Sequence, residues 1–285
     1  FISNLKKGRI PIQFIEHLNI NSIKLKESLA KTKVCFPHYM NRDLAEFLGY
    51  LIGDGYIDKK YLHISTQDDE NIDRITYLSH SLFGLQPKIK RDFRRKRLKM
   101  IFLTSKTLVT IFNKIFKIPI GKKGKFLRIP NQIITSDKEV LRSFLRAYFD
   151  CDSCPAQDHR QIELSSESEN LIIDTYNSLL KFGIISTISK KYQKNILYFY
   201  LTIRAKYAEK YADLIGFTIK YKSDKANKYQ IIGERQGSGK QDVIPVGDLL
   251  KKIRMSLGFS IREIDRYVNS YNIYEKTGII FRNSL

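Results

Sequence analysis

Tryptophan is absent from the 285 residues, and cysteine and histidine are rare, with three and five copies. Cys35, Cys151 and Cys154 do not make the paired framework of a disulfide-stabilised domain, which favours a reducing, intracellular setting such as the cytoplasm, the nucleoid or an organelle. Cys151 and Cys154 have CxxC spacing without a second pair, and the histidines show no paired spacing, so no zinc site is predicted. The phosphate-binding glycine loop of NTPases is also missing.

No apolar run approaches the roughly 20 residues that a membrane-spanning helix needs. The first residues also lack the order of a signal peptide, in which positive charge precedes an apolar core. The chain starts at Phe1 rather than at a methionine, which suggests a fragment or a processed chain. A hydrophobic content of 42% with 12% aromatic residues predicts a folded protein with a sizeable core, and the lack of a spanning run and of a signal peptide predicts no membrane partner.

Acidic residues are scarce, because 29 Asp and Glu stand against 50 Lys and Arg, for a formal net charge of +21. Such an excess favours a polyanionic partner, since neutralised phosphates release condensed counterions. A charged solubility surface or a membrane-surface protein would show the same excess. Charge alone favours nucleic acid over both alternatives.

An apolar stretch that ends in an acid occurs twice: FLGYLIGDG at 47–55 and LRAYFDCDS at 145–153. Helical spacing places small residues four positions apart on one face of each copy, which lets two helices approach closely. Packed helices would bring Asp54 and Asp152 side by side, although solvated helix ends are the simpler interpretation of two acids there. The small residues are Gly49 and Gly53 in the first copy, and Ala147 and Cys151 in the second.

Hydrophobic periodicity predicts the same order of elements from each copy onward. Asn41 is a candidate N-cap of the first helix, and Gly84 ends the second. In the first half we expect helices at 42–53, 69–83 and 105–116, with strands at 56–57, 61–66, 87–93 and 98–104. In the second half we expect a helix capped at Ser136 or Asp137 and ending near 151, helices at 168–182 and 204–215, and strands at 161–165, 184–191 and 196–203.

Landmarks in the two halves keep a nearly constant offset: Asp54 and Asp152 lie 98 residues apart, and Phe83 and Phe182 lie 99 apart. Such an offset indicates an internal duplication. The predicted fold is therefore α+β, a tandem αββαββα arrangement with pseudo-twofold symmetry and a small C-terminal helical segment. We expect four parts: a basic arm at 1–40, lobe one at 41–135, lobe two at 136–232, and a linker with C-terminal helices at 233–285.

The flanking parts are expected to be helical. In the arm, 10–18 and 22–30 have helical patterns. After a flexible linker at 233–240, a basic amphipathic helix at 246–254 precedes a glycine turn and a second helix capped by Ser260. Two short helices around such a turn are typical of a DNA-contacting helix-turn-helix, and equally of a helical buttress.

The two motif copies, each opening an αββαββα repeat on a basic chain, resemble the paired signatures of the LAGLIDADG homing endonucleases in their single-chain, two-lobed form. The resemblance covers residues 41–232, and the first copy is similar to archaeal and intein-borne members. It implies that the motif helices pack at the lobe interface and that Asp54 and Asp152 bind divalent metal at the scissile phosphates. Gly53 and Cys151 are assigned to the same metal sites. We expect Mg²⁺, with Mn²⁺ or Ca²⁺ able to replace it in binding, because hard ions prefer carboxylate and water oxygens.

The second copy departs from the family pattern at two positions. Cys151 replaces the usual Ala or Gly, and we interpret its thiol as a packing group at the helix interface. Ser153 replaces the usual Gly, and we expect an altered turn there, because glycine tolerates positive φ and serine does not. Lobe two is therefore the expected place of weaker cleavage. Asp150 is expected to be structural.

Family members also place a basic residue near each active site, after the last helix of each lobe. Lys123 lies 69 residues after Asp54, and Lys222 lies 70 residues after Asp152. We therefore expect Lys123 and Lys222 to orient water or to stabilise charge during catalysis. Ordinary phosphate contacts would explain the same two residues.

The resemblance implies that the strands of each lobe form a saddle along the major groove of DNA. Lobe one has basic residues alternating with apolar ones, and lobe two is more neutral, so we expect a non-palindromic target. A solvated charged face is the alternative. The candidate DNA-contacting residues are His63, Ser65, Lys88, Lys90, Arg91, Arg94, Arg95, Lys96, Arg97 and Lys99 in lobe one, and Gln161, Glu163, Ser165, Lys190, Tyr198 and Tyr200 in lobe two.

The resemblance thus predicts a monomeric, site-specific endonuclease that uses divalent metal to hydrolyse both strands of a long double-stranded DNA target. Two alternatives stay open, a non-catalytic DNA-binding regulator and an RNA maturase on the same fold. The sequence lacks a His-Asn end, so we expect a free-standing enzyme or an endonuclease segment descended from an intein, rather than a self-splicing protein.

Overall fold

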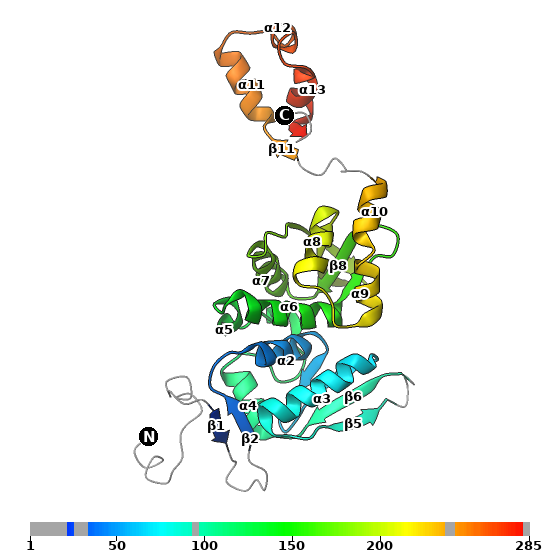
Figure 1. Ribbon diagram of the computed structural model, residues 1–285. Coiled ribbons are helices and arrows are strands. Elements are labelled where there is room, and N and C mark those ends of the chain that lie inside the picture. The colour runs from blue at the N-terminus through cyan, green and yellow to red at the C-terminus, as the bar shows by residue number, and fades with distance from the viewer. Residues whose placement is uncertain (1–21, 26–33, 93–96, 237–242, 282–285) are drawn as a thin grey trace, which may run out of the picture. The chain divides into compact units, whose positions relative to one another are not determined.

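The computed structural model describes residues 22–25, 34–92, 97–236 and 243–281 (Figure 1). Its contacts divide the chain into two compact units, one up to Ile232 and one from Gly233. The first unit contains both lobes, and the second contains the C-terminal helices. Among the described helices, none combines the length and the apolar character needed to cross a membrane.

Lobe one begins with helix α2 (Arg42–Gly53), and Asn41 caps it by accepting a hydrogen bond from the Leu44 amide at 2.8 Å. The strands form an antiparallel sheet in the order β3-β4-β6-β5. Along β4, buried and partly exposed residues alternate, so one face of the sheet packs on the helices and the other is open. The further elements are β3 (Gly55–Ile57), β4 (Leu62–Thr66), α3 (Asp69–Phe83), β5 (Lys88–Arg91), β6 (Lys99–Leu103) and α4 (Lys106–Lys114).

Lobe two repeats this order from helix α6 (Lys138–Asp152), which Asp137 caps by accepting from the Val140 amide at 2.9 Å. Its strands form the equivalent antiparallel sheet, β7-β8-β10-β9. The matching element and strand orders confirm the predicted α+β fold of two tandem repeats. The further elements are β7 (Ser153–Pro155), β8 (Gln161–Ser166), α7 (Glu169–Leu180), β9 (Ser186–Gln193), β10 (Ile196–Arg204) and α8 (Lys206–Leu214).

Helices α2 and α6 pack directly on each other between the two sheets (Figure 1). A Cβ atom placed on Gly49 would lie 2.6 Å from the carbonyl oxygen of Phe144 and 2.8 Å from the Cβ of Ala147. A Cβ atom on Gly53 would lie 2.4 Å from the Cβ of Cys151. These distances are shorter than van der Waals contact, so the two glycines set the separation of the helices. The structure brings all four small motif residues to one interface.

Gly49→Ala is expected to lower the free energy of unfolding by about 2 kcal/mol, because the helices must move apart to admit one methyl group. A loosely packed helix would instead gain about 1 kcal/mol from the same change, through the higher helix propensity of alanine. Urea unfolding followed by circular dichroism distinguishes the two signs. A more stable Gly49→Ala protein would contradict the close packing of α2 on α6.

The structure corrects the helix expected at 22–30. Ser22–Leu25 forms strand β1, which pairs antiparallel with β2 (Val34–Pro37). A ladder partner satisfies backbone groups that the ends of a short helix would leave without partners. Residues 26–33 and the helix expected at 10–18 lie outside the described residues.

Three segments near the ends of the lobes also differ from expectation. Two short helices, α5 (Asn131–Ile134) and α9 (Lys220–Ala226), are not signalled by periodicity, since a helix of one or two turns shows too little of it. Helix α10 (Tyr229–Gln236) runs into the stretch where the linker is expected to begin.

The second unit has three helices among its described residues rather than the two expected. They are α11 (Gly247–Ser256), α12 (Ile261–Asp265) and α13 (Tyr271–Thr277), with β11 (Val243–Pro245) paired to β12 (Ile279–Phe281). Ser260 forms a capping box with Glu263 at the start of α12. The unpredicted α13 packs on α11, where Arg254 pairs with Glu275 at 2.8 Å. A DNA-contacting role for this unit stays a prediction.

Candidate metal and nucleic-acid site

The two motif acids lie at the ends of the packed helices. Asp54 is the C-cap of α2, and Asp152 is the last residue of α6. The carboxylate of Asp152 lies against the end of α2, since a Cβ on Gly53, the residue before Asp54, would lie 3.7 Å from its Oδ2. Burial raises the pKa of Asp152 to about 7, with the negative charge of Asp54 as the second cause. Desolvation also raises the pKa of Asp54, against the opposing charge of Lys123. The pair is therefore held in a state that a cation would relieve.

Each acid has a lysine bound to the end of its helix. Nζ of Lys123 donates to the carbonyl oxygens of Leu51, Ile52 and Gly53 at 2.5 to 3.1 Å. Nζ of Lys222 donates to those of Phe149, Asp150 and Ser153 at 2.6 to 3.2 Å. An ammonium group has three donors, so each lysine commits its donors to the last turn of a helix or the residue after it.

This placement shows Lys123 and Lys222 as partners of helix-end carbonyls, and the water-orienting role expected of them stays a prediction. The last carbonyls of a helix have no partner within it, and a carboxylate there opposes the helix dipole. A lysine that donates to these carbonyls gives them hydrogen-bond partners, and its positive charge offsets the carboxylate and the negative end of the helix dipole. Burial lowers the pKa of both lysines, and the neighbouring carboxylates oppose that shift. Sequence spacing finds these residues and does not show which atoms they contact.

The residues that depart from the family pattern fit the second motif without strain. Ser153 has an extended backbone with φ −105°, and its hydroxyl donates to the carbonyl of Phe149 at 2.7 Å. The equivalent Gly55 is not among the glycines with positive φ. The expected turn defect at Ser153 is therefore wrong, because this position does not need positive φ. Burial and the flanking carboxylates raise the pKa of the Cys151 thiol, which keeps it neutral at the interface.

Asp150 has the structural role expected of it. Its carboxylate accepts from the amides of Thr218 at 3.0 and 3.1 Å and of Ile219 at 3.4 Å. Burial raises its pKa to about 6, against these hydrogen bonds and the charge of Lys222. Asp150 thereby fixes the segment that leads into α9, the helix that carries Lys222.

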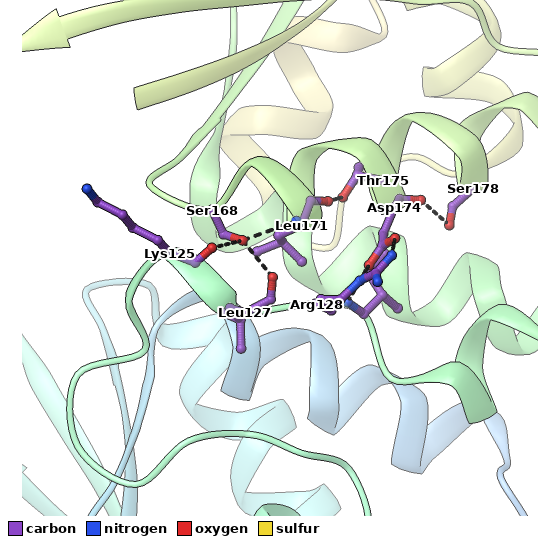
Figure 2. Close-up of polar contacts among 9 residues, drawn as sticks. Lys125, Leu127, Arg128, Ser168, Leu171, Asp174, Thr175 and Ser178 are labelled. Carbon is purple, nitrogen blue, oxygen red and sulfur yellow. Dashed lines mark hydrogen bonds and ion pairs between the residues drawn. The ribbon is translucent and has the colours of Figure 1, made fainter. Parts of the chain in front are cut away.

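Lobe two holds the segment that follows Lys123, and Figure 2 shows its contacts with Ser168 and Asp174. The hydroxyl of Ser168, the N-cap of α7, donates to the carbonyls of Lys125 and Leu127 at 3.0 and 2.6 Å. The buried carboxylate of Asp174 accepts from Arg128 at 2.8 and 3.1 Å and from the Ile129 amide at 3.2 Å. One lobe thus positions the lysine that caps the motif helix of the other. Sequence gives no signal for these contacts, which join residues more than 40 positions apart.

Asp174→Ala is expected to lower the free energy of unfolding by about 2 kcal/mol, because the buried Ile129 amide would lose its acceptor. Asp224→Ala is the matched control, since its pair with Lys220 is exposed and such pairs contribute about 0 to 1 kcal/mol. Urea unfolding of both variants measures the difference. Equal stabilities would contradict the role given to Asp174.

In lobe one the open face of the sheet holds some of the expected DNA contacts. Cross-strand register aligns Tyr56, His63, Phe102 and Lys88 in one row, and Ser65, Met100 and Lys90 in the next. Lys99 is an exception, since it lies opposite the buried Thr66 and pairs with Asp69 of α3 at 2.6 Å, on the helix side. Arg91 lies opposite Lys99. Arg97 is in a turn, and Arg94, Arg95 and Lys96 lie outside the described residues.

In lobe two the expected face needs one correction. Gln161, Glu163 and Ser165 lie opposite Arg204, Thr202 and Tyr200, and Tyr198 shares their face. Lys190 lies opposite the buried Phe199, on the other face, whereas Nζ of Lys191 is 5.1 Å from the ring centre of Tyr200. The hairpin turn Lys194–Asn195, with both φ positive, sets this register. A one-residue error in counting along a strand moves a side chain to the opposite face.

A model of the LAGLIDADG-like domain family matches residues 41–116 and 139–216, more than half of the sequence. The chain belongs to the LAGLIDADG-like family. The two matches coincide with the two repeats and stop before Lys123 and Lys222. The capping lysines of this LAGLIDADG-like protein therefore lie outside the stretches that identify it.

Curated relatives share only a segment with this LAGLIDADG-like chain. The replication factor C small subunit of Methanocaldococcus jannaschii is 33% identical over 94% of this chain and 14% of its own length. An A-type ATP synthase subunit of Pyrococcus abyssi is 30% identical over 66% of this chain and 18% of its own. The probable translation initiation factor IF-2 of M. jannaschii is 30% identical over 89% of this chain and 20% of its own length. The chain thus spans about a seventh to a fifth of these relatives.

Solved structures are similar at low identity. Full-length DUF199/WhiA from Thermotoga maritima has a TM-score of 0.50 and 16% identity, over 83% of this chain and 74% of that one. This likeness concerns the fold alone. The homing endonuclease I-DmoI in complex with DNA and Mn has a TM-score of 0.48 and 15% identity, over 62% of this chain and 97% of that one.

The donor set at the motif ends fits a hard divalent ion. Among the described residues, no group of three or more His, Cys, Asp or Glu side chains gathers to hold a metal. The protein would contribute the carboxylates of Asp54 and Asp152, and Mg²⁺ is commonly held by one or two carboxylates together with water and substrate phosphates. The carbonyl of Gly53 accepts a hydrogen bond from Lys123. At the equivalent place in lobe two, Lys222 donates to the carbonyl of Ser153 rather than to that of Cys151. The two predicted metal positions are therefore alike in their acids and unlike in their backbone.

Proposed function

We propose that this LAGLIDADG-like protein is a site-specific homing endonuclease that hydrolyses both strands of a long, non-palindromic DNA target. One observation carries the proposal: the interface of α2 and α6 brings together two carboxylates from opposite lobes. Both carboxyl groups have raised pKa values, and a lysine donates to carbonyls at the end of each of the two helices. A stability-driven arrangement would not place two acids together at helix C-termini, where they oppose the helix dipole and repel each other. Functional sites are where such shifts cluster.

Asp54 and Asp152 would hold the metal, Mg²⁺ in the first place, with Mn²⁺ or Ca²⁺ as substitutes in binding. The bound ion would supply charge stabilisation at phosphorus and an activated water. The close contacts at Gly49 and Gly53 keep the two carboxylates at a fixed separation. Lys123 and Lys222 hold the ends of the helices that carry them, and the sheets bind the duplex on either side. Each repeat thus supplies one acid, one lysine and one sheet for one half of the target, so a single chain acts as a monomer.

The comparison with curated relatives supports a mobile origin. A replication factor, an initiation factor and a subunit of an ATP synthase have unrelated tasks. Each of these relatives is similar to this chain over at most a fifth of the relative's own length. A segment shared by such different proteins has the distribution of an inserted element. We therefore infer intein or intron mobility for this chain, and the reading frame around its coding sequence tests that inference.

A second function, DNA binding without cleavage, is favoured by one observation. Both lysines commit their three donors to carbonyls at or just after the ends of the motif helices, which leaves no donor for a water or a phosphate. A regulator would keep the fold and the charged faces and would need no metal.

The test is a selection on a library of randomised duplexes, run in parallel with Mg²⁺ for cleavage and with Ca²⁺ for binding. The protein with both Asp54→Asn and Asp152→Asn is the control. Recovery of one cut sequence with Mg²⁺, lost in the control, is the expected result. A sequence enriched by binding with no cut in Mg²⁺ or Mn²⁺ would overturn the nuclease and support the regulator.

A further inference from the structure

The open faces of the two sheets differ in the row of residues that starts beside each motif acid. In lobe one the strand after Asp54 starts a row of four residues that crosses the sheet: Tyr56, His63, Phe102 and Lys88. In lobe two the strand after Asp152 starts the equivalent row: Cys154, Glu163, Thr202 and Thr187. We call these the aromatic row and the polar row. Because each begins two residues after a motif acid, both would face the base pairs near the cleaved phosphates.

The aromatic row forms a continuous surface of tilted rings in contact. The ring of His63 lies 5.3 Å from that of Tyr56 and 5.0 Å from that of Phe102, and Tyr61 joins from the side at 5.5 Å from Phe102. Desolvation, followed by the charge of Lys123, lowers the pKa of His63, which favours the neutral form of its ring. Nζ of Lys90 lies 5.2 Å from the ring centre of Phe102. The surface is thus apolar at its centre and cationic toward the edge strand β5.

The polar row has the opposite character. Glu163 is its only charged residue, on a chain with a net charge of +21. A carboxylate that faces a polyanion is repelled by the phosphates, so its placement there needs a donor on the partner. Glu163 is partly exposed, and its neighbours in the row are short polar side chains, Thr202 on β10, which is buried, and Thr187 on β9, which is exposed.

We propose that the two rows read the target by opposite chemistry: the aromatic row contacts thymine methyl groups, and Glu163 accepts a hydrogen bond from the amino group of cytosine. The inference rests on the proposed function, because it takes the major groove of DNA as the occupant of both faces. The occupant follows from charge, since Lys88, which ends the aromatic row, and Lys90, in the next row, both lie on the exposed edge strand β5.

The base edges explain why each row has one best partner. In the major groove only thymine presents a methyl group, and apolar side chains select it. Cytosine presents an amino donor there without an acceptor on the same base, whereas adenine presents its amino group next to the N7 acceptor. A carboxylate, which only accepts, is repelled by N7 and therefore favours cytosine. The centre of the target is then predicted to carry thymine on the side of lobe one and cytosine on the side of lobe two.

The experiment starts from the sequence recovered by the duplex library, in the Ca²⁺ binding arm as well as the Mg²⁺ cleavage arm. Replacing the central thymines on one side by uracil removes only the methyl groups and is expected to weaken binding about fivefold. In Phe102→Ser protein the thymine and uracil duplexes are expected to bind equally. Glu163→Gln is expected to shift the preferred base on the other side from cytosine to adenine by about tenfold, because an amide pairs with both N6 and N7 of adenine.

The matched control is Glu169→Gln, which removes an equal charge from an exposed position at the start of α7, away from the sheet. It is expected to leave the base preference unchanged. Uracil duplexes bound as tightly as thymine duplexes, or an unchanged cytosine preference in Glu163→Gln, would overturn the inference while leaving the endonuclease intact. A binding arm with the predicted preferences and no cut in the Mg²⁺ arm would support the inference and contradict the nuclease.

Discussion

Replacing Asp152 by asparagine is expected to abolish double-strand cleavage and at the same time to stabilise the metal-free protein near pH 8. The loss of cleavage should be at least about a thousandfold, because a catalytic metal contributes several kcal/mol of charge stabilisation and Asn is a poor ligand for it. The gain in stability follows from the position of the carboxylate, which is partly buried and faces Asp54.

The sign of the stability change depends on pH. The pKa of Asp152 is raised to about 7 in the folded protein from an ordinary value of 3.8, so the folded state holds this proton more tightly than the unfolded state does. Stability from that proton is present in acid and is lost as the pH rises from about 4 to about 7. Asparagine carries no such charge. Asp152→Asn should therefore gain on the order of 2 kcal/mol over the wild type near pH 8 and little near pH 4.

Urea unfolding in EDTA at both pH values measures this, with Asp73→Asn as the control. Asp73 is exposed on α3, away from the motif ends, and its replacement should change neither stability nor cleavage. A cleaving Asp152→Asn protein would contradict the metal role. An inactive variant with unchanged stability near pH 8 would contradict the strained pairing of the two acids.

Local patterns in the sequence predict the elements that frame the site. The side chains of Asn41 and Asp137 cap the two motif helices, because a cap is recognised by residue type and position alone. Gly84 ends α3 in the left-handed region, where glycine is favoured. The small residues four apart predict the close helix pair, since the helical period places them on one face. These features depend on neighbours within about four positions.

Long-range contacts explain what the sequence does not predict. The hydroxyl of Ser168 and the carboxylate of Asp174 bind the segment between the lobes, and no local pattern distinguishes them from other polar residues on a helix. Strand β1 depends on the presence of β2. Lys190 and Lys191 exchange faces because the turn, and not the alternation, sets their register. The carbonyl partners of Lys222 lie some 70 positions away.

Lys222→Met is expected to have the second large effect, because this lysine is buried and its ammonium bonds three carbonyls at the end of α6. Methionine has similar length and no donors. The free energy of unfolding should fall by about 4 kcal/mol near pH 8, since helix carbonyls lose their partner and buried carboxylates lose a compensating charge.

The loss of unfolding free energy in Lys222→Met should be smaller in acid. Removing the positive charge of Lys222 raises the pKa values of Asp150 and Asp152 further, and this penalty exists only while they are ionised. Because their folded pKa values are about 6 and about 7, most of the Coulombic part should vanish by about pH 5, leaving the lost hydrogen bonds. A difference of equal size at pH 5 and pH 8 would contradict the charge-compensating role.

Lys220→Met supplies the control on the same helix, since its side chain is 78% exposed and pairs only with Asp224 among its described ion pairs. The pH dependence of the cleavage rate then distinguishes a lysine that positions the helix end from one that acts on the attacking water. A positioning role predicts that Lys222→Met, assayed where it is still folded, cuts more slowly at every pH with an unchanged alkaline limb of the rate profile. An alkaline limb that disappears in this variant would instead return Lys222 to direct action on the attacking water, because a lysine that titrates in the reaction defines that limb.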